Sequence, residues 1–303
     1  MKVARRDFGL LLLAGILMLA CLTRPTIPLT RYVFHYLFAL DITQSMNARD
    51  YHTSGLPSDR LSFGKSALRN AIRKLPCGSK AGISLFSTKD VLLLIEPLEI
   101  CSHFAAIDDT IAHIDWRMAW SADSNIERGL YSGILASRNL TPNPHLVFMS
   151  DGEQTVRELH RPPLAKHHDS IKGFIFGVGG TSLAPIPKLD KNNRISGYWT
   201  IGEVEEIANG SLDRETVEAD SLNPDHTYQS GLRESNLKML AAATGLEYHR
   251  LESPAQFSDI LQTAELAESR TVDTDIRWPL ALFSVVLIVA VYLLPAKSTD
   301  AID

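Results

Sequence analysis

The sequence predicts an α/β fold with a mostly parallel, doubly wound central sheet, and three features indicate this fold. Residues 32–40 form an apolar run rich in aromatic and branched side chains, which is typical of a strand buried on both faces. Residues 146–150 form a second such run, and Asp41 and Asp151 follow the two runs directly. Residues 59–75 carry apolar side chains at helical spacing between them, and Ser58 is the expected cap of this helix. Strands that alternate with amphipathic helices build parallel sheets.

One antiparallel hairpin is expected at the edge of this sheet. Residues 81–87 and 91–95 are the two expected strands, with a turn around Lys89. Cys77 precedes the first strand and Cys101 follows the second, each equally far from Lys89. An antiparallel hairpin would therefore bring the two cysteines level, and we predict a disulfide between them. Two free buried thiols are the alternative, whereas a disulfide indicates an oxidising compartment.

The remaining elements follow the same alternation until residues 181–231. That stretch is polar, acidic overall and only weakly periodic, with a small hairpin expected at 190–198. We interpret it as an insertion near the top face of the sheet, where long loops are often functional. The other expected helices cover residues 103–114, 125–139, 159–168, 234–244 and 255–266, and the other expected strands cover residues 173–180 and 247–251. The helix at 125–139 is expected to turn Ile126, Leu130, Ile134 and Leu135 inward.

Hydroxyl and carboxylate side chains gather where the expected strands end. Asp41, Thr43 and Ser45 follow the first strand at a spacing of two, Ser124 precedes a helix, and Asp151 ends a later strand. In open α/β sheets, ligands bind at the carboxyl ends of the strands. Oxygen ligands are preferred by hard cations such as Mg²⁺. The sequence therefore predicts a divalent-cation site, with Mg²⁺ as the first candidate and Mn²⁺ or Ca²⁺ as alternatives.

These segments resemble the von Willebrand factor A (vWA) domain and its metal-ion-dependent adhesion site, the MIDAS. The family pattern is D-x-S-x-S, then a Thr in a second loop, then an Asp before Gly in a third. The matching residues are Asp41, Thr43, Ser45, Ser124 and Asp151. Thr43 stands for Ser and Ser124 for Thr, and both keep a hydroxyl. The resemblance covers most of residues 32–270. It implies a Rossmann-like fold and metal-bridged binding of a partner protein that supplies an acidic residue, rather than catalysis.

A narrower resemblance points to one group of bacterial vWA proteins. The chain looks similar to the vWA accessory proteins of bacterial methanol oxidation in the segments DITQSMN, LPCGSKAG, SNIERGLYSGI and IPKLDKNNRISGYW. That resemblance implies an assembly or metal-insertion factor for a periplasmic quinoprotein methanol dehydrogenase. The implied partners are methanol dehydrogenase subunits and other accessory proteins of the vWA and AAA+ families.

Three further residues are candidates near the site. Trp116 and Trp120 are either a partner-binding surface or packing for a lid, and Glu153 is either a third acid near the metal or a solvated loop carboxylate. Two functional alternatives also stay open, namely a metal-dependent, phosphatase-like hydrolase and a scaffold in which the cation only ties the sheet end together. We expect no enzyme, because no Walker A, H-E-x-x-H or G-x-S-x-G motif is present.

Apolar segments flank the expected vWA domain, which spans residues 30–270. Residues 1–23 hold positive charges followed by an apolar run, which indicates a signal segment or a membrane anchor that is cleaved, lipidated or retained. Residues 272–277 are expected to lead into a transmembrane helix over residues 278–295, and residues 296–303 to form a cytoplasmic tail. The N-terminal positive charges then place the domain in the periplasm, anchored to the bacterial inner membrane.

Composition excludes one broad class of partner. The chain has 303 residues, a formal net charge of −5 and a pI near 6.1, and it contains no run of Lys and Arg. Nucleic-acid-binding surfaces need clustered positive charge, so we expect no nucleic-acid partner.

Overall fold

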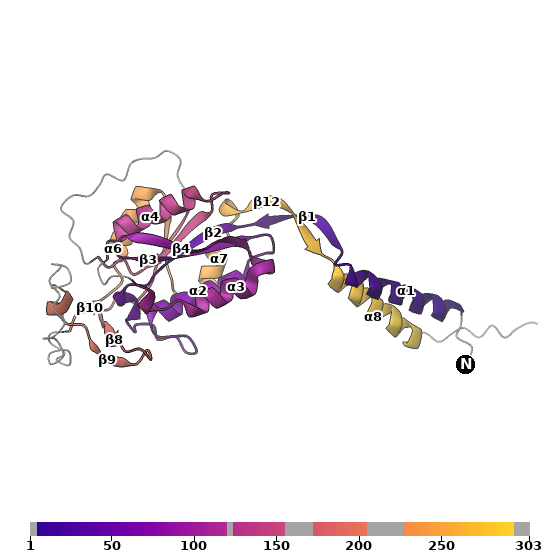
Figure 1. The fold of residues 1–303 in the computed structure, drawn as a ribbon, viewed down its shortest axis with the longest axis horizontal. Coiled ribbons are helices and arrows are strands. Elements are labelled where there is room, and N and C mark those ends of the chain that lie inside the picture. The colour runs from indigo at the N-terminus through magenta and orange to yellow at the C-terminus, as the bar shows by residue number, and fades with distance from the viewer. Residues whose placement is uncertain (1–4, 120–123, 155–171, 205–226, 294–303) are drawn as a thin grey trace, which may run out of the picture. The chain divides into compact units, whose positions relative to one another are not determined.

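The structure is a computed structural model that describes residues 5–119, 124–154, 172–204 and 227–293 (Figure 1). The chain divides into two compact units. One unit comprises residues 32–268, and the other combines residues 1–31 with residues 269–303.

The larger unit is built on a six-stranded sheet in the order β11-β6-β5-β2-β3-β4. All neighbouring strands in this sheet run parallel except β3 and β4, which form the antiparallel edge hairpin. The predicted α/β fold with a mostly parallel sheet is therefore confirmed. The strands are β2 (His35–Asp41), β3 (Lys80–Ser87), β4 (Asp90–Glu99), β5 (His145–Ser150), β6 (Gly173–Gly177) and β11 (Glu247–Arg250).

Helices cover both faces of this sheet because its central strands are apolar on both sides. On β2, Phe38 belongs to one buried cluster and its neighbour Leu37 to the other, as the two-residue period of a strand requires. The first cluster lies under α2 (Arg60–Lys74), α3 (Ile100–His113) and α7 (Pro254–Ile260), and the second under α4 (Ile126–Asn139) and α6 (Glu234–Thr244) (Figure 1).

The strand order reverses beside β2, and this reversal positions the candidate site. Strand β2 pairs with β3 on one side and with β5 on the other, and Leu40 lies opposite Met149. Asp41 and Asp151 therefore lie at the carboxyl ends of neighbouring strands. In open α/β sheets a crevice forms at such a reversal, since the connections on its two sides lead in opposite directions.

Three local expectations are corrected. Residues 32–40 are not one strand, because Val33 ends β1 (Thr26–Val33) and β2 begins only at His35. Helix α2 is capped by Asp59 and not by Ser58, since the Asp59 carboxylate accepts a hydrogen bond from the Ser62 amide at 2.8 Å. Residues 272–277 do not lead straight into a helix but mostly belong to β12, which pairs with β1.

Helix α4 buries the expected face except at one residue. Ile126 and Leu130 are buried, whereas Leu135 was expected to point inward and 47% of it is exposed. The buried stripe also includes Gly129 and Ser137. A β-carbon at Gly129 would lie 2.0 Å from the Phe86 ring, so this helix approaches the sheet too closely for a larger residue. Small side chains at the contact therefore outweigh the apolar pattern.

The described part of the insertion forms short strand pairs. The expected hairpin is confirmed as β8 (Pro187–Leu189) with β9 (Ile195–Tyr198). The segments that lead into and out of the insertion pair with each other as β7 (Ala184–Pro185) and β10 (Gln229–Ser230). The helix expected at 159–168 lies outside the described residues.

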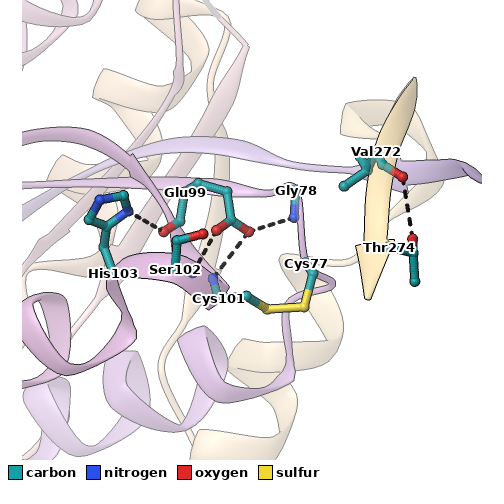
Figure 2. Close-up of a disulfide and its surroundings, with 8 residues drawn as sticks. All are labelled: Cys77, Gly78, Glu99, Cys101, Ser102, His103, Val272 and Thr274. Atoms are coloured by element: carbon teal, nitrogen blue, oxygen red, sulfur yellow. Dashed lines mark hydrogen bonds between the residues drawn. A yellow bond between two sulfur atoms is a disulfide. The ribbon is translucent and has the colours of Figure 1, made fainter. Parts of the chain in front are cut away.

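The disulfide between Cys77 and Cys101 is confirmed, with 5.3 Å between the two α-carbons (Figure 2). The Glu99 carboxylate holds the backbone next to both cysteines of this disulfide. This carboxylate accepts hydrogen bonds from the Gly78 amide at 2.7 Å and from the Ser102 amide at 2.6 Å. Strand β3 begins and strand β4 ends at this point, so the disulfide closes the open end of the edge hairpin.

We expect Cys101→Ser to lower the free energy of unfolding by about 3 kcal/mol, because a closed loop of this length restricts the unfolded chain. Urea denaturation of the full chain, with and without reductant, measures the effect. Cys21→Ser is the matched control, since Cys21 is the free cysteine. Equal stability of the two variants, or an equal response to reductant, would contradict the prediction.

The smaller unit pairs two apolar helices, α1 (Arg5–Leu22) and α8 (Arg277–Leu293). The Ser284 hydroxyl donates a hydrogen bond to the Ala14 carbonyl at 2.9 Å, and both residues are buried between the helices. Most other apolar side chains of the pair are exposed, including Phe8, Leu19 and Trp278. Over the described ranges, no helix combines the length and the apolar character that crossing a membrane requires.

Candidate metal centre

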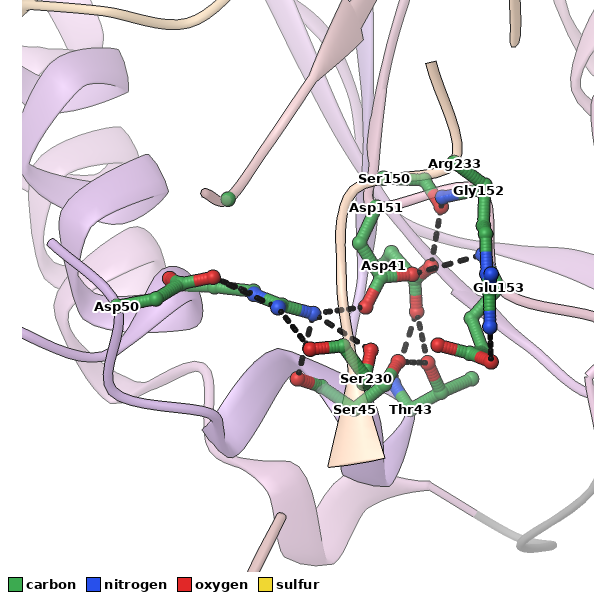
Figure 3. A network of polar contacts seen from close by, with 12 residues as sticks. Asp41, Thr43, Ser45, Asp50, Ser150, Asp151, Gly152, Glu153, Ser230 and Arg233 are labelled. Atoms are coloured by element: carbon green, nitrogen blue, oxygen red, sulfur yellow. Dashed lines mark hydrogen bonds and ion pairs between the residues drawn. The ribbon is translucent and has the colours of Figure 1, made fainter. Parts of the chain in front are cut away.

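The Asp41 carboxylate is the centre of the first group of predicted ligands (Figure 3). Its Oδ1 accepts hydrogen bonds from the Thr43 amide at 2.9 Å and the Thr43 hydroxyl at 2.6 Å. The Thr43 hydroxyl oxygen lies 3.3 Å from that of Ser45. These oxygens converge because the chain leaves β2 and turns at once into the short 3-10 helix η1 (Gln44–Asn47).

Asp151 and Ser124 join this group from two other loops. Asp151 follows β5, and its Oδ1 accepts a hydrogen bond from the Glu153 amide at 3.0 Å. The Ser124 hydroxyl donates to the Glu153 carbonyl at 3.0 Å, and a bridge to Thr88 fixes the Ser124 backbone beside the hairpin turn. The structure thus gathers all five predicted ligands around the carboxyl ends of β2 and β5.

Burial makes it unfavourable for the Asp41 and Asp151 carboxylates to be ionised together without a nearby positive charge. Neither Asp41 nor Asp151 is accessible to solvent. Burial, and next the charge of Asp151, raise the pKa of Asp41 to about 7, although hydrogen bonds from Ser150 and Thr43 oppose this shift. A divalent cation would offset the repulsion between the two carboxylates.

The donor set fits a hard cation through its oxygens. Among the described residues, no group of three or more His, Cys, Asp or Glu side chains is placed to hold a metal ion. A cation would therefore rely on the hydroxyls of Thr43, Ser45 and Ser124 beside Asp41 and Asp151. Within the described residues, the buried Oε2 of Glu153 has no hydrogen-bond partner. A buried carboxylate oxygen left in this way is stabilised by a nearby cation or an ordered water.

The raised pKa of Asp41 predicts a pH dependence of stability for the cation-free protein. The pKa rises from the ordinary 3.8 to about 7 on folding, so this group stabilises the folded state below pH 3.8. That contribution is lost as the pH rises through about 7. From about pH 5 to about pH 8, we expect the free energy of unfolding in EDTA to fall more in the wild type than in Asp41→Asn. Urea titrations at both pH values check this, and parallel changes in the two proteins would contradict it.

The sequence did not indicate Arg60 as a site residue, yet it borders the site. Its Nη1 donates to Asp151 Oδ2 at 2.7 Å and to the Ser45 carbonyl at 3.3 Å, and the whole side chain is buried. A signal was present, because Arg60 falls on the same helical stripe as the buried Phe63 and Ala67. An arginine in the first turn of an amphipathic helix is nonetheless normally read as solvated.

The other candidate residues lie as follows. Glu153 is buried, with 4% exposed, and its Oε1 accepts hydrogen bonds from the Tyr228 hydroxyl at 2.9 Å and Arg233 Nη2 at 3.2 Å. It is thus a third acid beside the site and not a solvated loop carboxylate.

Trp116 begins η2 (Trp116–Met118) and packs against the core, and its Nε1 donates a hydrogen bond to Asn193 Oδ1 at 2.9 Å. Trp120 lies outside the described residues.

Comparisons with known proteins support the fold. No protein-family model matches the chain, and no curated protein matches it by sequence. An aerotolerance-related membrane protein from Bacteroides fragilis has a TM-score of 0.53 and 19% identity, over 75% of this chain and 96% of that one. The protein BatB from Bacteroides thetaiotaomicron has a TM-score of 0.54 and 20% identity, over 76% and 96%. At this identity the likeness shows the fold alone, an α/β fold with a mostly parallel central sheet.

Proposed function

We propose that this protein is a cation-dependent protein-binding module held at a membrane. The observation that carries the proposal is the convergence of three hydroxyls and two buried aspartates where the strand order of a vWA-like sheet reverses. A partner's acidic side chain is the complementary ligand for such a centre.

The residues of this chain favour binding over catalysis. A bound divalent cation would supply a positive charge that an incoming carboxylate can reach. Hydroxyl oxygens are neutral, so Thr43, Ser45 and Ser124 leave more of that charge uncompensated than carboxylates would. Asp41 is held by hydrogen bonds from Thr43 and Ser150 and is thereby oriented before any ligand arrives. The proposed binding role requires neither a nucleophile nor a general base.

The proposed membrane association and the proposed periplasmic location are supported by other observations. Helices α1 and α8 expose many large apolar side chains, which water does not favour. A disulfide in the larger unit fits an oxidising compartment, such as the periplasm, with the chain at the inner membrane. The similar protein from Bacteroides fragilis is described as a membrane protein. Recovery of the native protein in the soluble fraction after cell lysis would oppose this part of the proposal.

The role in maturing a methanol dehydrogenase remains the narrowest version of this proposal. It rests on the sequence resemblance in four segments, and the comparisons lend it no support. Association with an AAA+ ATPase likewise rests on sequence resemblance alone.

Affinity capture from native membranes tests the proposed function. The full chain is used as bait in Mg²⁺ and in EDTA, and Asp41→Asn is the test variant. Asp109→Asn is the matched control, because the Asp109 side chain is 74% exposed and pairs with His113 on its own helix. We expect partners that are recovered in Mg²⁺ by the wild type and the control, and lost in EDTA and with Asp41→Asn.

Two other outcomes would overturn the proposal. The same partners in every condition would make the site a structural device. Metal-dependent hydrolysis of a generic phosphate ester that disappears in Asp41→Asn would establish an enzyme instead. Recovery of methanol dehydrogenase subunits among the metal-dependent partners would support the narrower role.

A further inference from the structure

Arg60 makes an unusually complete set of contacts for a buried guanidinium. Its Nε and Nη2 both donate to Asp50 Oδ2, at 2.9 and 2.7 Å. Its Nη1 donates to Asp151 Oδ2 at 2.7 Å and to the Ser230 hydroxyl at 2.8 Å. The Arg60 side chain is wholly buried, and 3% of the Asp50 side chain is exposed. Charge-assisted bonds of this kind, shielded from water, fix geometry strongly.

These contacts divide the two oxygens of Asp151. Oδ2 is held by Arg60, whereas Oδ1 accepts a hydrogen bond only from the backbone amide of Glu153 within the described part of the chain. The Oδ1 edge is therefore the one left to act on a cation, directly or through water. Arg60 thus decides which edge of the carboxylate is available.

The charges of the site also require Arg60. Four buried or nearly buried carboxylates, Asp41, Asp50, Asp151 and Glu153, gather here with two guanidiniums, those of Arg60 and Arg233. Four negative and two positive charges leave two negative charges, which one divalent cation would balance. Without Arg60, Asp50 and Asp151 would lose the ion pairs that they make within the described residues.

Arg60 further connects the centre to both ends of the insertion. The Gly180 amide donates to Asp50 Oδ2 at 2.7 Å, and Arg60 Nη2 donates to the Ser230 carbonyl at 3.1 Å. A β-carbon at Gly179 would lie 2.6 Å from Arg60 Nε, so the backbone there passes directly over the guanidinium. The loop that carries Ser45 receives its own hydrogen bond from Arg60.

We propose that Arg60 is a permanent cation of the metal centre and the positioning residue that turns the Oδ1 edge of Asp151 toward the exchangeable cation. This inference rests on the proposed function only in requiring cation binding, and not in requiring a protein partner. Two consequences follow. The protein folds without a divalent cation, because Arg60 already compensates Asp151. Cation affinity depends on the shape of the guanidinium as well as on its charge.

Arg60→Lys tests the role of shape, because lysine keeps the charge but cannot contact Asp50, Asp151 and Ser230 at once. Arg69→Lys is the matched control on the same helix, since Arg69 makes two 2.7 Å hydrogen bonds to Asp108 away from the site. Mn²⁺ binding to the detergent-purified full chain is measured by isothermal titration calorimetry, and folding by circular dichroism and thermal unfolding in EDTA. We expect Kd for Mn²⁺ to rise about tenfold in Arg60→Lys and to stay within about twofold in Arg69→Lys.

A second variant covers the case in which Arg60→Lys does not fold. Asp50→Asn leaves Asp151 untouched but removes the negative charge on the far side of Arg60. The uncompensated guanidinium then opposes the cation, and we expect Kd for Mn²⁺ to rise about threefold or more. Wild-type affinity in a folded Arg60→Lys, or in Asp50→Asn if the first variant fails to fold, would overturn the inference and reduce Arg60 to a structural ion pair. Absence of Mn²⁺ binding by the wild type would overturn this inference and the proposed function together.

Discussion

Asp41→Asn is expected to weaken Mn²⁺ binding at least about 100-fold, which corresponds to about 2.7 kcal/mol. Asp41 holds the hydroxyl of Thr43 and that of Ser150, at 2.6 Å each, so its charge and its orienting effect are lost together. Calorimetric titration of the purified full chain measures the change. Asp109→Asn, on the exposed side of α3, is the control and should bind Mn²⁺ as the wild type does.

The same substitution should remove the stabilisation that the cation gives. A ligand present at 100 times its Kd stabilises the folded state by about 2.7 kcal/mol, which is roughly 5–10 °C in Tm for a domain of this size. We expect that rise for the wild type on addition of Mn²⁺ and almost none for Asp41→Asn. A variant that still gains the full rise would show that Asp41 is not part of the cation site.

Arg60→Met should be the most destabilising single change at the site. It leaves Asp50 and Asp151 buried without a positive partner, and breaking a buried ion pair in this way costs about 3–5 kcal/mol. Urea denaturation in EDTA measures the loss. Arg69→Met removes the partly exposed ion pair with Asp108 on the same helix and should cost less than about 1 kcal/mol.

The double variant Asp50→Asn/Arg60→Met identifies the cause of that loss. It removes one of the two orphaned charges, so it should be more stable than Arg60→Met alone by about 1 kcal/mol or more. If the double variant were less stable still, the loss would come from packing of the long Arg60 side chain and not from uncompensated charge.

The gathering of the candidate ligands at one edge of the sheet could be predicted because most of the group is local in the sequence. The spacing of Asp41, Thr43 and Ser45 directs three oxygens to one point once the preceding residues form a strand. Asp151 follows from the same rule, since a second buried strand ends there. The Cys77–Cys101 disulfide was predictable for a related reason, because a hairpin sets which of its residues lie opposite each other.

Other parts of the site had no local signal. Ser150 donates to Asp41 Oδ2 from the neighbouring strand, and Ser230 accepts from Arg60 across 170 residues of sequence. Glu153 was open to two interpretations until Tyr228 and Arg233 were found to surround it. These contacts depend on the order of the strands in the sheet and on the place where the chain re-enters the domain after the insertion. The spacing of nearby residues in the sequence encodes neither feature.

The α/β class, the edge hairpin with its disulfide, and the five oxygen-bearing residues of the candidate site follow from the sequence alone. They depend on periodicity, on spacing and on where each buried strand ends, which local chain geometry sets. The pairing of β1 with β12, the outward face of Leu135 and the burial of Arg60 between Asp50 and Asp151 emerge only in the folded chain. Burial of a charge is favourable only when its partners arrive from other segments, and the packing of the whole sheet determines which segments meet.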